Sequence, residues 1–133
     1  MATLARASAV HVAVAFLSMG GWALFANRAH GSAAFAPALA QGALSGAITF
    51  VLKRVLEALA ARLTGWRALL LPPLITASVI LAVLVTVHRL IGTPEIAATI
   101  AVPWCVSTFY AFVYTATLVQ SRAREGRAKE RHV

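Results

Sequence analysis

The stretch HRLIGTPE, residues 88–95, separates two strongly apolar runs and decides how they are joined. Gly92 is typical of the residue that follows a helix, because glycine adopts the left-handed conformation of a C-terminal cap without strain. Thr93 and Pro94 suit the cap and first turn of a new helix, and the Glu95 carboxylate would lie at its positive end. The stretch therefore predicts a tight turn between two antiparallel helices.

Four apolar runs of the chain are long enough to cross a bilayer. The chain has 133 residues, of which 60% are hydrophobic and 12% charged, whereas about 25% charged residues is usual for a soluble domain. A membrane-spanning helix needs roughly 20 apolar residues, and the runs of that length are 7–26, 32–52, 68–87 and 96–121. We therefore predict an all-α integral membrane four-helix bundle, with residues 1–121 as one domain and 122–133 as a basic tail.

The basic residues are distributed unevenly between the two sides of the predicted bundle. The net charge is +8, and only Arg28 and Arg89 of the twelve Lys and Arg residues fall on the side opposite the termini. Basic flanks face the cytoplasm, so we predict that both termini are cytoplasmic. The alanine and arginine bias is typical of a GC-rich bacterial genome, which indicates a multi-pass protein of the bacterial inner membrane. A signal-peptide interpretation, with a cut in APALAQ (36–41), is disfavoured because that site lies too far from the first apolar run.

Two polar stripes run along the predicted spans at about 100° per residue. A hydroxyl that faces lipid has no hydrogen-bond partner, so both stripes should face the interior of the bundle. The stripe on the second span consists of Gln41, Gly42, Ser45, Gly46 and Thr49. The stripe on the fourth span includes Thr99, Ser107, Tyr110, Tyr114 and Thr117. The spacing of Gly42 and Gly46 allows another helix backbone to approach closely.

The stripes support two hypotheses about function. In the first, they form a packing seam between the second and fourth spans, and the protein is an accessory or scaffold subunit of a membrane complex. In the second, they line a polar path or head-group cleft, and the protein is a small transporter, or a lipid-head-group carrier or flippase component. Ion and proton pathways usually contain an intramembrane carboxylate or base, and the stripes contain none. The first hypothesis is therefore preferred, with Gln41 as the residue to examine under the second.

The expected partners follow from the same pattern. The apolar spans predict contact with the lipid bilayer, and the basic cytoplasmic flanks predict attraction to anionic lipid. We expect a homo-oligomer or a larger membrane-protein partner. The basic tail lacks the interleaved aromatic residues that single-stranded nucleic acids stack on, so no nucleic-acid partner is predicted. The segment 53–66 keeps a helical period beyond the second span, with Lys53 and Glu57 one turn apart, and either lies on the membrane surface or extends that helix.

Few residues have the chemistry of a catalytic or metal site. His30, His88 and Glu95 are predicted on the outer face, where imidazole and carboxylate groups can bind a divalent metal or relay protons. Their spacing does not place two ligands on one helix face, so the turn remains the preferred interpretation and no metal site is predicted. The sequence has no Asp, no CxxC, no HExxH and no phosphate-binding glycine loop. We therefore predict no cofactor and no enzymatic activity.

Overall fold

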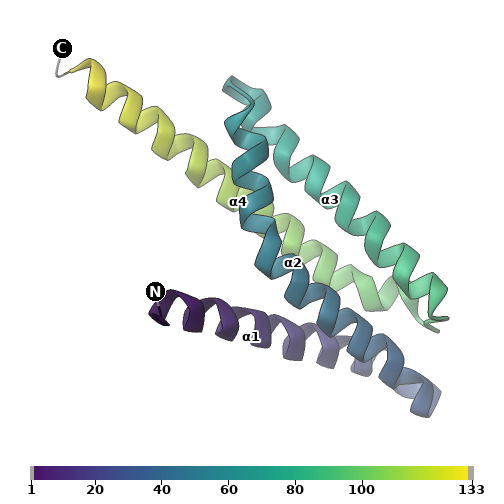
Figure 1. The fold of residues 1–133 in the computed structure, drawn as a ribbon. Helices are drawn as coiled ribbons and strands as arrows, with labels where there is room; N and C mark the ends of the chain where they lie inside the picture. The colour runs from purple at the N-terminus through teal and green to yellow at the C-terminus, as the bar shows by residue number, and fades with distance from the viewer. Residues whose placement is uncertain (1, 132–133) are drawn as a thin grey trace.

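The computed structural model describes residues 2–131, with side chains from residue 9 onward, as four long helices. These are α1 (Ala2–Ala26), α2 (Phe35–Ala61), α3 (Gly65–Leu90) and α4 (Ile96–Glu130), with the short 3-10 helix η1 (Arg28–Ala34) between α1 and α2. Consecutive helices run in opposite directions (Figure 1). All four are long and apolar enough to cross a membrane. The predicted all-α four-helix bundle is therefore confirmed.

All four helices extend beyond the predicted spans, and α1 does so by beginning at Ala2. The segment after residue 52 continues α2 without a break to Ala61, and α4 continues through most of the basic tail to Glu130. Helix α3 begins at Gly65, three residues before the predicted span, so Pro72 and Pro73 lie about two turns inside it. The Thr76 hydroxyl donates to the carbonyl oxygens of both prolines, at 3.0 and 3.1 Å. These bonds satisfy the buried hydroxyl of Thr76 within its own helix.

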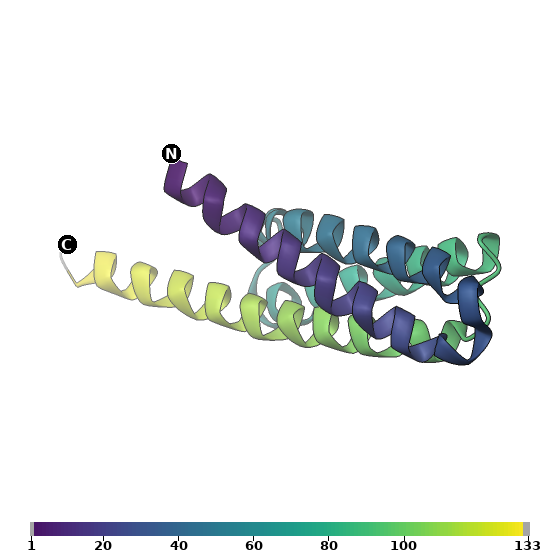
Figure 2. The same cartoon turned by 90° about the horizontal axis from the view of Figure 1, so that it is seen from below.

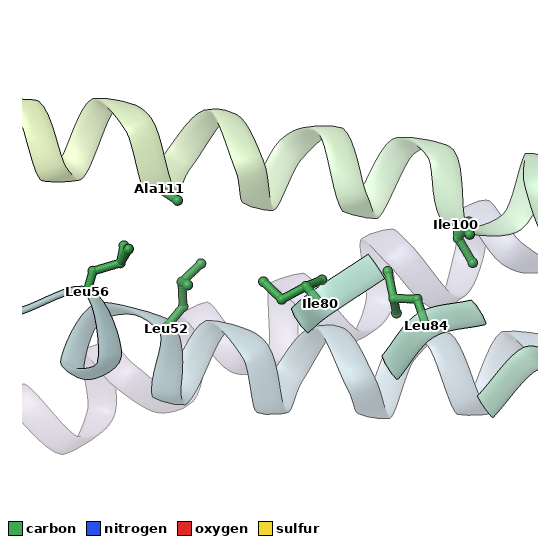
Figure 3. Close-up of a cluster of buried hydrophobic side chains, with 6 residues drawn as sticks. All are labelled: Leu52, Leu56, Ile80, Leu84, Ile100 and Ala111. Atoms are coloured by element: carbon green, nitrogen blue, oxygen red, sulfur yellow. The ribbon is translucent and has the colours of Figure 1, made fainter. Parts of the chain in front are cut away.

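The buried aliphatic core lies between α2, α3 and α4. Figure 3 shows its side chains converging from the three helices: Leu52, Leu56, Ile80, Leu84, Ile100 and Ala111. Leu56 and Leu84 are completely inaccessible. Since lipid is as apolar as leucine, association of these helices depends on close van der Waals packing more than on the hydrophobic effect. The cluster makes α2, α3 and α4 a three-helix unit to which α1 is added.

Helix α1 joins this unit through glycines. A Cβ atom at Gly42 would lie 2.9 Å from the Phe16 carbonyl oxygen, and one at Gly20 would lie 2.9 Å from the Ala38 carbonyl oxygen. The two backbones are therefore in direct contact, as small residues permit in membranes. Gly46 also faces α1, with Val12 as its neighbour. The glycine face of α2 thus packs on α1, and the suggestion that it meets the fourth span is wrong.

The turn at residues 88–95 has the expected path but a different internal chemistry. Gly92 has φ of 68°, and the amides of Gly92 and Thr93 donate to the carbonyls of Arg89 and His88 at 3.2 and 2.9 Å. This pair of bonds is the Schellman motif that ends many helices. The cap residue of α4 is Glu95, without a side-chain capping bond, and not Thr93. The Thr93 hydroxyl is bonded to His88 instead.

The two ends of the bundle differ in charge. Figure 2 shows both termini and the α2–α3 link at one end, and η1 and the α3–α4 turn at the other. We call the first the basic end, because the flanks there carry all the Lys and Arg residues except Arg28 and Arg89. We call the second the turn end. This alternation is the arrangement that the charge pattern predicts for four antiparallel helices.

Candidate functional site

Asn27, directly after α1, is the centre of a hydrogen-bond network at the turn end. Its side chain is completely buried. The amide nitrogen Nδ2 donates to Thr99 Oγ1 at 2.7 Å and to the Ala23 carbonyl at 2.9 Å. Its oxygen Oδ1 accepts the backbone N–H of Glu95 at 3.0 Å. The network therefore ties the end of α1 to the start of α4 with every donor of the amide used.

Asn27 belongs to the short polar link NRAHG between the first two apolar runs and is not among the predicted site residues. The missed signal is its position, since an asparagine immediately after a long apolar run is close enough to the membrane to need internal partners. Thr99 was placed on a polar stripe, and its hydroxyl also donates to the Glu95 carbonyl at 2.6 Å. The partner of Thr99 on another helix could not be read from the stripe.

His88 organises a second network, which joins α3 to α2. Its Nε2 atom lies 3.0 Å from Gln41 Oε1, and its Nδ1 atom lies 2.7 Å from Thr93 Oγ1. Gln41 Nε2 in turn donates to Ser45 Oγ at 2.9 Å. Because an amide oxygen only accepts, Nε2 must carry the ring proton, and Nδ1 of the neutral ring then accepts from the Thr93 hydroxyl. All four side chains are buried.

The outer-face candidates divide into two groups. His30 Nε2 lies 3.0 Å from Glu95 Oε1, and both side chains are partly exposed, at 38% and 52%. His88 points away from this pair into the bundle, where Gln41 and Thr93 use both of its ring nitrogens. Within residues 2–131, no group of three or more His, Cys, Asp or Glu side chains could hold a metal ion.

The remaining stripe residues lie closer to the basic end. Ser107 and Thr117 donate to backbone carbonyls of their own helix, at 3.0 and 2.8 Å. The side chains of Thr49 and Tyr110 are exposed. The stripes therefore do not form one continuous polar track. Their polar groups are bonded inside the bundle at the turn end. Further along they bond to their own helix or are exposed.

A cavity of about 650 Å³ lies between α1, α2 and α4. Trp22 of α1 donates its indole N–H to the Ala98 carbonyl of α4 at 2.9 Å, which holds these two helices together near the turn end. Towards the basic end α1 diverges from α4, as Figures 1 and 2 show. The inner walls of the cavity are mainly apolar and include Val12, Ala15, Met19, Ile48 and Val106. Its polar lining includes Thr49, Lys53, Arg54, Glu57, Ser107 and Tyr110.

Glu57 is the carboxylate at the basic end of this cavity. Its Oε1 atom accepts a hydrogen bond from the Tyr114 hydroxyl at 2.5 Å. The Tyr114 ring stacks on Tyr110 with centroids 5.6 Å apart, and Lys53 Nζ lies 5.9 Å from the centre of the Tyr114 ring. The Arg54 guanidinium lies 5.1 Å from the centre of the Phe50 ring. Two cations, a carboxylate and a stacked pair of phenol rings are therefore grouped near the mouth of a mainly apolar cleft.

The comparisons with known proteins add no further constraint. No protein-family model matches the chain, and neither the curated proteins nor the solved structures yield a match. The function is therefore inferred from the geometry of the two ends of the bundle. The turn end offers polar groups that are already bonded to one another, and the basic end offers an open cleft.

Proposed function

We propose that the protein is a membrane-embedded binding protein for an amphiphile, whose polar head lies at the mouth of the cleft between α1, α2 and α4. The observation that carries this proposal is the gradient of the lining, from apolar walls near the turn end to Lys53, Arg54 and Glu57 at the basic end. Ligand cavities of roughly 300–1,000 Å³ with apolar walls and a few polar groups are the usual form of binding sites. The cleft fits that description.

The distance along α2 between the charged mouth of the cleft and the turn end agrees with a lipid ligand. Arg54 lies roughly 28 Å along α2 from Phe35, at ~1.5 Å per residue. This length is close to the ~30 Å thickness of the hydrocarbon core. The cations of the cleft are therefore at head-group level when Phe35 is at the opposite boundary. With the basic end in the cytoplasm, as the positive-inside rule favours, the cleft faces the inner leaflet of a bacterial inner membrane.

An accessory role agrees better with the turn end than conduction does. The buried groups of Asn27, Gln41 and His88 are bonded to neighbours and leave no polar path through that end. A carrier would have to break these bonds in each cycle. We therefore propose lipid binding from one leaflet within a larger membrane complex or a homo-oligomer, with lipid transfer across the membrane as the alternative that requires opening of the turn end.

The test is to fill the cleft and ask whether bound lipid is lost. Thr49→Trp places a large ring in the cleft, whereas Ala47→Trp adds the same ring to an exposed position of α2 that does not line the cleft. Purification in mild detergent followed by native mass spectrometry should show phospholipid on the wild type and on Ala47→Trp, and little on Thr49→Trp. A wild type without bound amphiphile, or a Thr49→Trp variant that keeps it, would contradict the proposal. The same spectra report any stoichiometric protein partner or second copy.

A further inference from the structure

We infer that the cleft takes a zwitterionic phospholipid head that carries an ammonium group, and that Glu57 is the residue that selects it. This inference depends on the proposed function, because it assigns a head-group class to the same site. The alternatives are a purely anionic head, or pairing of Glu57 with the Lys53 side chain of its own helix.

Glu57 has one carboxylate oxygen that no described residue bonds. One carboxylate oxygen accepts from Tyr114, and in the described part of the chain Glu57 has no ion-pair partner and no other hydrogen bond. The side chain is half-buried and lines the cleft. A carboxylate that is partly removed from water is stabilised by a paired cation. The free oxygen, Oε2, is therefore available to an ammonium group of a ligand.

Two stacked phenol rings lie beside the Glu57 carboxylate. Tyr110 is 43% exposed and lines the cleft, and Tyr114 is stacked against it. Ring faces attract cations, and aromatic side chains recur around the ammonium groups of ligands. Lys53 Nζ, at 5.9 Å from the Tyr114 ring centre, shows that an ammonium group fits near this ring. Yet Lys53 makes no ion pair with Glu57.

Two basic side chains near Glu57 are available to bind the phosphate of the head group. Lys53 and Arg54 are exposed and flank the same mouth, one turn before Glu57 on α2. Both side chains are long and flexible, and arginine binds phosphate through a bidentate fork. A head with a phosphate and an ammonium group can therefore place its negative charge beside the two cations and its positive charge beside Glu57. A purely anionic head would leave Glu57 unpaired and close to the phosphate.

The experiment compares two phospholipids with identical acyl chains. Delipidated protein in mild detergent is titrated with phosphatidylethanolamine, which carries an ammonium group, and with phosphatidylglycerol, which does not, and bound lipid is counted by native mass spectrometry. Wild type should prefer phosphatidylethanolamine by about tenfold, the range of a charge-assisted hydrogen bond at a partly buried site. Glu57→Gln, which keeps an acceptor for Tyr114, should lose this preference. Glu125→Gln, on the exposed tail of α4, should keep it.

The outcomes separate this inference from the proposed function. Equal binding of the two lipids, with both excluded by Thr49→Trp, would contradict the role of Glu57 and leave the cleft as a lipid site. A wild-type preference for phosphatidylglycerol, or an unchanged preference in Glu57→Gln, would also overturn the inference. Binding of neither lipid would remove the proposed function itself. Competition by water-soluble phosphoethanolamine as strong as by the lipid would overturn the assignment to a membrane source.

Discussion

Both ends of this bundle contain polar side chains between the helices, and they use them in opposite ways. At the turn end Asn27, Gln41 and His88 are buried, and neighbours satisfy their polar atoms. At the basic end Tyr110 and Glu57 line an open cleft, and Glu57 keeps a carboxylate oxygen that no described residue bonds. Polar groups inside a membrane protein thus have two fates. Where helices converge they fix the packing, and where helices diverge they remain available to a ligand.

The largest expected loss of stability comes from changing the glycine contact that holds α1 against α2. Gly42→Ala puts a Cβ atom 2.9 Å from the Phe16 carbonyl oxygen, so α1 must move, and we expect a loss of about 2 kcal/mol of unfolding free energy. Thermal or denaturant unfolding in detergent measures it. Gly21→Ala is the matched control, because a Cβ there meets nothing within 4 Å. That variant should be unchanged or slightly more stable, as alanine is the better helix former. Equal stability of the two variants would show that the α1–α2 contact is not as close as described.

A smaller effect is expected when the network of the turn end is cut. Asn27→Ala leaves the Glu95 amide without its acceptor and removes the bond to Thr99. The expected loss of unfolding free energy is about 1–2 kcal/mol, since the orphaned Glu95 amide is partly buried. A double-mutant cycle with Thr99→Val measures the coupling of the pair directly. Additive effects, with no coupling between Asn27 and Thr99, would remove the claim that this bond locks α1 to α4.

The smallest effect is expected at the rim of the turn end. His30 and Glu95 form an exposed pair, and exposed pairs typically contribute about 0.2–1 kcal/mol. Glu95→Gln should therefore lower the unfolding free energy by less than Asn27→Ala does, and added salt should remove even that difference. A loss as large as that of Asn27→Ala would show that the rim, and not the buried network, holds this end closed.

The sequence predicts the local features of this fold well. Four spans, the alternation of basic flanks and the glycine that ends α3 depend on residues close together in the chain. Which helix each face packs against cannot be predicted from such local patterns. A period of 3.6 residues places Gln41, Gly42 and Ser45 on one face, but nothing in it says that the glycine meets α1 while the glutamine meets His88 of α3.

The candidate site was predictable only in part for the same reason. Tyr110 and Tyr114 could be placed on one inward stripe, because they lie one turn apart on α4. Glu57 was paired with Lys53 along its own helix, whereas the structure joins it to Tyr114, 57 residues away in the chain. That contact depends on the register of α2 against α4, which side-chain packing over the whole bundle determines. The divergence of α1 that opens the cleft likewise follows from where its glycine and tryptophan contacts stop.

The most direct test of a closed turn end and an open basic end is thiol labelling at four positions. In a Cys105→Ala background, single cysteines replace Thr49, Ser107, Thr99 and Ala47, and delipidated protein in detergent reacts with a water-soluble maleimide. We expect rapid labelling at positions 49 and 107 in the cleft, and slowing at both when phospholipid is added. Position 99 is buried in the turn-end network and should react slowly. Position 47 lies on the outer face of α2 at membrane depth, where detergent covers it and keeps out the water-soluble reagent, so it should also react slowly. Added lipid should change neither rate. Labelling of position 99 as fast as position 49, or no lipid protection at positions 49 and 107, would contradict the account.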